Sequence, residues 1–306
     1  MARALLAALP IGRFGLRISS GDGRTHRDFL SHDGCCGKRS GACKEAGADH
    51  YSRTVVSEYH AVGGDFIAWA DSPGDKAPSY AAGKKTVGYT FQVNAEAVIS
   101  EKPDLVIGLH GLHDRFTEVM KQNGIPFMLL SASSLEDVER AAEVLGDVTG
   151  HHAEGVKARD QLRKDMESVV SGLSLKEYTC AILHGTPHSV TLEGKGTIAT
   201  ETAALLHIRN VFVLDNDRDM KLPPFSLETL VAKDPDIIFL TTMVMPGQQQ
   251  EAFRKSLMEQ PAWAGMRAVK AGRVYFLPQK LFLSSPGMEY PKALSYMADV
   301  VYGGQR

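Results

Sequence analysis

Histidine and methionine side chains, which can bind transition metals, recur in short clusters along this chain. Together with two aromatic residues near them, the candidate ligand-binding residues are Tyr89, Phe91, His110, His113, His184, His188, Met243 and Met245. Imidazole nitrogens and thioether sulfurs are common ligands of transition metals and of haem iron. This donor set favours a metal chelate or haem over a sugar or an amino acid as the ligand.

Ordinary structural roles remain open for each of these residues. Met243 and Met245 bracket the end of a predicted strand, where they can equally belong to the hydrophobic core. A His-x-x-His pair such as His110 and His113 is too common to indicate zinc by itself. The sequence has no G-x-S-x-G, P-loop or H-E-x-x-H motif, and no G-x-G-x-x-G after a strand, so catalysis is the weaker hypothesis.

Each cluster follows an aliphatic run of the kind found in buried parallel strands. The runs cover residues 105–109, 179–183 and 237–240. In open α/β sheets, ligands bind beyond the carboxyl ends of the strands. The clusters are therefore expected at a ligand-binding edge.

The elements around two of these strands form an internal repeat. Residues 94–107 and 226–239 align without a gap, each with a helix cap, a first-turn Glu, aliphatic residues, Pro-Asp and a strand. One copy lies on each side of a long polar helix predicted over residues 152–170. Such a duplication predicts two similar α/β lobes rather than one sheet.

Composition and charge narrow the class of protein. The chain has 306 residues, 34 Lys+Arg against 36 Asp+Glu, and 43% hydrophobic residues. This balance gives no reason to expect nucleic acid as a partner, and the hydrophobic content suffices for a large core. No apolar run approaches the roughly 20 residues of a membrane-spanning helix. Residues 1–53 differ from the rest and are expected to be an atypical segment that is disordered or processed; their outline of a signal segment is not convincing.

Residues from about 54 to 306 resemble the substrate-binding proteins of ABC importers for iron chelates, haem and cobalamin. The stretches that carry the resemblance are residues 87–89, 94–98, 102–107, 134–138, 194–197, 226–228, 234–238, 261–263 and 268–275. Within the family, the chain looks most like the haem-binding lipoproteins of Gram-positive type. Where those proteins carry an axial Met and an axial His, this chain has Phe91 and Met243.

The resemblance implies an α/β fold with two Rossmann-like lobes joined by one long interdomain helix. The expected domains are residues 1–53, the N-terminal lobe 54–151, the helix 152–174 and the C-terminal lobe 175–306. It also implies that one acidic residue per lobe docks onto the permease, here Glu96 and Glu201. Met243 and His188 are the metal-ligand candidates.

We therefore expect an extracytoplasmic solute-binding protein, periplasmic or lipid-anchored, and not an enzyme. It captures haem or a ferric siderophore between its lobes and, as a monomer, delivers this iron chelate to an ABC permease and its ATPase. The alternatives are a cobalamin-binding importer component and a metal-binding enzyme on a related two-lobed fold.

Overall fold

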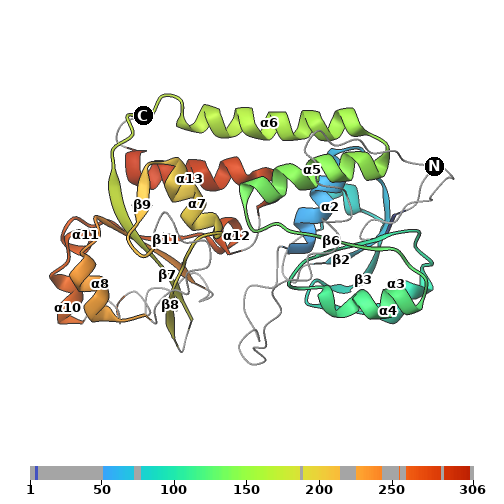
Figure 1. The fold of residues 1–306 in the computed structure, drawn as a ribbon, viewed down its shortest axis with the longest axis horizontal. Coiled ribbons are helices and arrows are strands. Elements are labelled where there is room, and N and C mark those ends of the chain that lie inside the picture. Colours follow the sequence, from blue (N-terminus) through green and yellow to red (C-terminus); the bar gives the residue numbers. More distant parts are fainter. Residues whose placement is uncertain are drawn as a thin grey trace, which may run out of the picture. The chain divides into compact units, whose positions relative to one another are not determined.

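The computed structural model describes most of the chain after residue 50. The described residues are 4–5, 51–71, 77–186, 189–213, 225–242, 255, 260–283 and 286–303. The chain divides into two compact units, each with its own sheet and core (Figure 1). Unit 1 comprises Met1–Ala132 and Arg140–Ala158, and unit 2 comprises Ser133–Glu139 and Arg159–Arg306.

Unit 1 is built on a six-stranded sheet in the order β4-β3-β2-β1-β5-β6. Its strands are β1 (Ala4–Leu5), β2 (Phe66–Asp71), β3 (Lys85–Tyr89), β4 (Gln92–Val93), β5 (Val106–Leu109) and β6 (Phe127–Leu130). All neighbours are parallel except β3 and β4, which form a hairpin. Parallel strands need helical crossovers, and the aliphatic strand β5, buried at every residue, fits this arrangement.

Four helices of unit 1 and its sheet share one hydrophobic core. The helices are α2 (Tyr51–Ala61), α3 (Ala95–Ser100), α4 (Thr117–Gln122) and the larger part of α5 (Leu135–Thr149). Trp69, Tyr59 and Ile107 are completely or almost completely buried in this core. Burial of such large side chains is worth about 1.5–3 kcal/mol each, which makes this cluster the main source of stability in the unit.

The dipeptide Ala4–Leu5 differs from what the sequence indicates for the N-terminal segment. It forms β1, which pairs in parallel with β2 on one side and β5 on the other. A two-residue strand leaves no periodicity to detect in a sequence. Its place in the sheet depends on partners that lie more than 60 residues further along the chain.

Unit 2 contains a five-stranded sheet in which β11, β10, β7 and β8 are consecutive and β9 also pairs with β7. The strands are β7 (Tyr178–Gly185), β8 (Val190–Leu192), β9 (Ile208–Asn210), β10 (Ile237–Thr242) and β11 (Val274–Leu277). Only β8 runs antiparallel to its neighbour.

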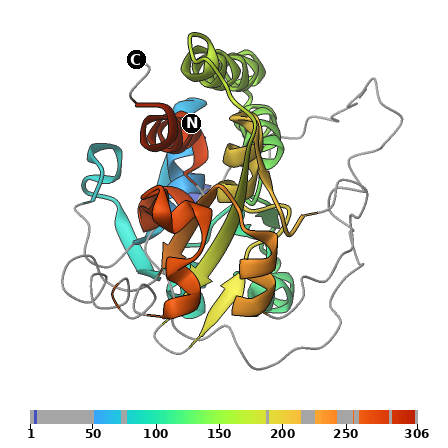
Figure 2. The same cartoon turned by 90° about the vertical axis from the view of Figure 1, so that its left-hand side faces the viewer.

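Helices cover both faces of the central strands of unit 2 (Figure 1). Ile182 and Phe239 lie in the cluster with α7 (Ile198–Leu205) and α13 (Tyr290–Tyr302). Leu183 and Leu240 lie in the cluster with α8 (Leu227–Lys233), α10 (Pro261–Ala264) and α11 (Arg267–Lys270). The arrangement is seen from a perpendicular direction in Figure 2. This layering confirms the α/β class predicted from the sequence.

The remaining helices are α6 (His152–Val170) and α12 (Gln279–Phe282). Both α5 and α6 contribute residues to each of the two units. In unit 1, Gly146 of α5 and Gly155 of α6 approach so closely that a Cβ on Gly146 would lie 2.8 Å from the Gly155 Cα. Glycine at both positions allows this contact.

The internal repeat is confirmed as two helix–strand units. In unit 1, Asn94 accepts a hydrogen bond of 3.1 Å from the Ala97 N–H at the start of α3, and β5 follows. In unit 2, Ser226 accepts one of 3.4 Å from the Thr229 N–H at the start of α8, and β10 follows. In the described part of the chain, no helix combines the length and the apolar character that crossing a membrane requires.

Candidate functional site

Tyr89 and Phe91 lie in the hairpin at the end of β3 in unit 1. Tyr89 is 49% exposed, which is unusual for a large aromatic side chain, and Phe91 is half-buried. Gly88 has φ +109°, and a Cβ there would meet the carbonyl oxygen of Gln92 at 2.4 Å, so only glycine fits this hairpin. The Arg115 guanidinium donates a hydrogen bond of 2.7 Å to the Phe91 carbonyl, which fixes the turn. The hairpin therefore exposes the Tyr89 ring, on which a planar ligand can stack, and the Arg115 hydrogen bond holds its backbone in place.

His110 follows β5 and is exposed. Its Nδ1 lies 2.6 Å from Oδ1 of Asp114, whose other carboxylate oxygen accepts a hydrogen bond from the Gly111 N–H. The carboxylate thus orients the imidazole at the carboxyl edge of the sheet. A histidine held in this way can present its other ring nitrogen to a ligand.

His113, by contrast, uses both ring nitrogens inside unit 1. Its Nδ1 accepts a hydrogen bond of 2.9 Å from the Leu109 N–H, and its Nε2 donates one of 2.9 Å to the Thr90 carbonyl. The residue is 3% exposed, and burial lowers the pKa of the imidazole. His113 therefore supports the backbone, and we remove it from the expected ligand-binding set.

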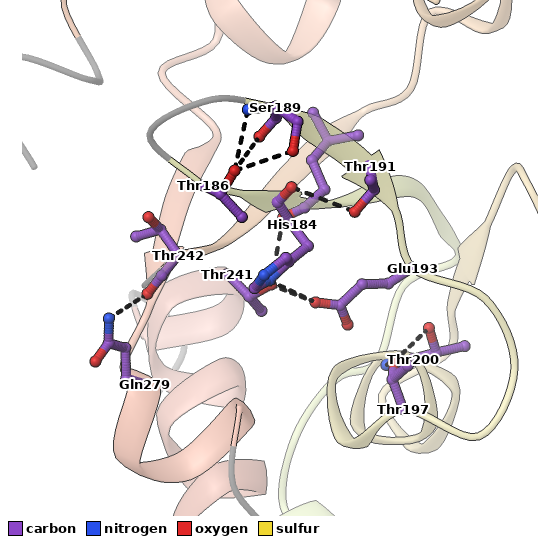
Figure 3. Close-up of polar contacts among 11 residues, drawn as sticks. His184, Thr186, Ser189, Thr191, Glu193, Thr197, Thr200, Thr241, Thr242 and Gln279 are labelled. Atoms are coloured by element: carbon purple, nitrogen blue, oxygen red, sulfur yellow. Dashed lines mark hydrogen bonds and ion pairs between the residues drawn. The ribbon is translucent and has the colours of Figure 1, made fainter. Parts of the chain in front are cut away.

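In unit 2, His184, Thr241 and Glu193 form a polar cluster at the carboxyl ends of β7 and β10 (Figure 3). His184 and Thr241 are register partners on the two parallel strands, and Nδ1 of His184 lies 3.0 Å from the Thr241 hydroxyl. That hydroxyl donates a short hydrogen bond to Oε1 of Glu193, which directly follows β8. The cluster joins three segments of the sheet at its predicted ligand edge.

Burial shifts the pKa values of two groups in this cluster. Burial raises the pKa of the Glu193 carboxyl, and the hydroxyls of Thr241 and Thr197 act in the opposite direction. Burial also lowers the pKa of His184, which favours the neutral imidazole. The second carboxylate oxygen, Oε2 of Glu193, is buried without a hydrogen bond. A buried carboxylate oxygen without a partner is energetically costly.

Three predicted ligand residues, His188, Met243 and Met245, lie outside the described residues. Their roles stay predictions. Among the residues that the structure does describe, no group of three His, Cys, Asp or Glu side chains is placed to hold a metal ion.

The two acidic residues expected to dock onto a permease have different surroundings. Glu96 is exposed in the first turn of α3. Glu201 is half-buried, and its Oε2 accepts hydrogen bonds from the Leu135 N–H and the Tyr290 hydroxyl. The residue that corresponds to Glu96 in the repeat is Glu228, which is exposed in the first turn of α8. The alignment of the two repeat copies in the sequence already pairs Glu228 with Glu96.

Glu193 and Arg115 are further residues at these edges, and together with Thr241, which follows Leu240 at the end of a predicted strand, they take part in the contacts described above. Glu193 stands directly after a strand, and Thr241 ends an aliphatic run. Neither position reveals from sequence alone that the two side chains meet. Only the pairing of β7 with both β8 and β10 brings them together.

The fold, the duplicated helix–strand unit and the edge residues define a two-unit solute-binding protein. The periplasmic binding protein family matches residues 46–281, and the chain belongs to this family.

Several proteins of known identity or structure are similar to the chain. The high-affinity heme uptake system protein IsdE of Staphylococcus aureus is 23% identical over 218 residues, which cover 71% of this chain and 74% of IsdE. An ABC transporter substrate-binding protein from Listeria monocytogenes has a TM-score of 0.73 at 22% identity, covering 81% of this chain and 95% of that one. The periplasmic vitamin B12 binding protein BtuF of Vibrio cholerae has a TM-score of 0.63 at 19% identity, covering 82% and 94%.

Proposed function

We propose that this chain is the extracytoplasmic binding protein of an ABC importer and that its ligand is an iron chelate, with haem first and a ferric siderophore second. The observation that carries this proposal is the type of donor at the sheet edges. Tyr89 and His110 are exposed and His184 is half-buried, and each can offer a single donor atom. Among the residues that the structure describes, neither histidine belongs to a group of three His, Cys, Asp or Glu side chains placed to hold a metal ion. Single donors suit a metal that a chelator already holds, because such a metal needs only one or two further ligands.

The comparisons support haem over other chelates. IsdE of Staphylococcus aureus, which is similar to this chain, is a heme uptake protein. Vitamin B12 is the second candidate, because BtuF has a similar fold and cobalamin is also a metal held by a macrocycle. A catalytic function has no comparable support, since the relatives are binding proteins.

Delivery requires contact with a permease and its ATPase, and the repeat supplies equivalent acidic residues for it. Glu96 and Glu228 hold the same position in two helix–strand units, and both are exposed. Glu201 is less suited because its carboxylate oxygen already accepts two hydrogen bonds. We therefore place the second docking residue at Glu228. The protein acts as a monomer in the periplasm or on a lipid anchor.

The test is a titration of the full-length chain with hemin, followed by absorbance in the Soret region. We expect a saturable one-to-one shift that weakens in Tyr89→Ala. The matched control is His207→Asn, which changes an exposed histidine next to β9, at the amino end of β7. Parallel titrations with cyanocobalamin and a ferric hydroxamate identify the alternatives. Saturable binding of one of these without hemin binding would overturn haem as the ligand.

A further inference from the structure

We propose that His184 binds the iron of the captured chelate through Nε2, and that Thr241 and Glu193 position it by fixing its tautomer. This inference rests on the proposed function and names the ligand atom that unit 2 supplies.

The three side chains lie on the same face of the sheet of unit 2. In β7, His184 alternates with Leu183 and follows Ile182 by two residues, so it shares the face of Ile182. In β10, Thr241 follows Phe239 in the same way, and Ile182 and Phe239 belong to one core cluster. The Glu193 N–H donates to the Ile182 carbonyl at 2.9 Å, which sets Glu193 beside this position. The three polar side chains thus lie on the sheet face that carries the core residues Ile182 and Phe239, at the carboxyl end of the strands.

The direction of the hydrogen bonds determines which nitrogen of His184 carries the proton. The Thr241 hydroxyl has a single proton, and it donates this proton to Oε1 of Glu193. Its other contact, with the Leu183 carbonyl at 3.5 Å, is much longer. The Thr241 oxygen must then accept from Nδ1–H of His184, 3.0 Å away. A neutral imidazole with the proton on Nδ1 has a free lone pair on Nε2.

The rest of the His184 ring remains available for a ligand. The side chain is 22% exposed, and no hydrogen bond to Nε2 is found among the described residues. His113 gives a useful contrast, because both of its ring nitrogens are satisfied by the backbone. Of these two inward-facing histidines, only His184 keeps a nitrogen for an external partner.

The buried carboxylate of Glu193 supports a binding role over a purely structural one. Its side chain is 10% exposed, and Oε2 has no hydrogen bond in the described structure. A carboxylate placed only for stability would be expected to pair both oxygens, since leaving one buried and unpaired costs about 1–3 kcal/mol. Carboxylates that orient a metal-binding histidine through its second nitrogen are a recurrent feature of metal sites, here with a hydroxyl between them.

The first experiment tests the tautomer without any ligand. Long-range ¹H–¹⁵N spectra of the full-length protein at pH 8 distinguish Nδ1–H from Nε2–H histidines. We expect Nδ1–H for His184 and loss of this preference in Thr241→Val, but not in Thr242→Val, which makes the same change one residue along the strand. An Nε2–H tautomer in the wild type, with the Glu193 carboxyl donating to Thr241, would overturn the inference whether or not haem binds.

The second experiment uses hemin as the probe. We expect His184→Gly to change the Soret and visible spectra of the bound iron, and free imidazole to restore them. Thr241→Val should weaken hemin binding by about 10- to 100-fold, with Thr241→Ser close to wild type. Wild-type binding with an unchanged spectrum in His184→Gly would overturn this inference alone. Absence of hemin binding by the wild type would overturn haem as the ligand and, with it, His184 as an iron ligand.

Discussion

The Tyr290 hydroxyl donates a hydrogen bond of 3.0 Å to Oε2 of Glu201, the same oxygen that accepts from the Leu135 N–H at 2.9 Å. Tyr290 is fully buried, and burial together with the adjacent Glu201 carboxylate raises the pKa of its hydroxyl. Glu201 thus ties the start of α5 to α7 and α13 within unit 2. These contacts give Glu201 a structural role, whereas Glu228 is exposed and accepts no such hydrogen bonds from buried groups in the part of the chain that the structure describes.

Replacement of Glu201 should therefore lower stability. We expect Glu201→Ala to reduce the free energy of unfolding by roughly 1–3 kcal/mol, because the buried Tyr290 hydroxyl loses its acceptor. Urea denaturation of Glu201→Ala, Tyr290→Phe and the double variant measures this. The two changes should be clearly non-additive, since both remove the same hydrogen bond. A Glu201→Ala variant as stable as Glu228→Ala would contradict the assignment.

Glu96 and Glu228 should affect transport rather than binding. Both are exposed in the first turn of a short helix, so removing either carboxylate should change unfolding free energy by no more than about 0.5 kcal/mol. We expect Glu96→Ala and Glu228→Ala to keep hemin binding but to reduce uptake into vesicles that contain the permease and ATPase. Glu118→Ala, a first-turn change in α4, is the control. Normal uptake by the Glu96→Ala, Glu228→Ala double variant would rule out this docking surface.

His113 should contribute to stability and to its acid dependence. His113→Phe leaves the Leu109 N–H and the Thr90 carbonyl without partners, and we expect a loss of roughly 2–4 kcal/mol. The folded chain lowers the pKa of His113, so the unfolded chain binds the proton more readily. The stability supplied by this residue is present above about pH 6.5 and declines as the pH falls below it. Urea titrations measure the free energy of unfolding at pH 7.5 and at pH 5. Its decrease from pH 7.5 to pH 5 should be smaller for His113→Phe than for the wild type.

Glu58 should have the opposite pH dependence. It is 1% exposed in α2, and burial raises the pKa of its carboxyl from 4.5 to about 8. Between these two values the unfolded chain has released its proton and the folded chain has not, so stability falls as the pH rises. Glu58→Gln should match the wild type near pH 4.5 and exceed it by roughly 3–5 kcal/mol at pH 8.

The measurement is the difference in free energy of unfolding between Glu58→Gln and the wild type, obtained by thermal and urea unfolding across pH 4.5–8. This difference reports on the Glu58 carboxyl alone. Glu193, whose pKa is also raised by burial, is present in both proteins and cancels in the difference. A difference that stays constant with pH would show that Glu58 titrates alike in the folded and unfolded chain.

Local patterns in the sequence were sufficient to predict the helix–strand units of both halves. Asn94 and Ser226 cap α3 and α8 as expected, and the aliphatic runs after each Pro-Asp form β5 and β10. These features depend on residues within a few positions of one another, so the sequence displays them directly. The α/β class and the membership in the binding-protein family follow from the same segments.

Contacts between distant residues could not be predicted in this way. The short strand β1, the pairing of Thr241 with His184, and the hydrogen bond between Tyr290 and Glu201 all join residues more than 50 positions apart. His113 and His184 look alike as histidines at the ends of buried strands. His113 uses both ring nitrogens for the backbone, whereas Nε2 of His184 has no hydrogen bond to any residue that the structure describes.

The sequence alone therefore determined the class of protein, the repeated unit and the sheet edges at which the candidate ligand residues are expected. Tertiary structure decided which of those residues are available for a ligand. The physical reason is that availability depends on hydrogen-bond partners and burial. Strand pairing and helix packing set these between segments far apart in the chain.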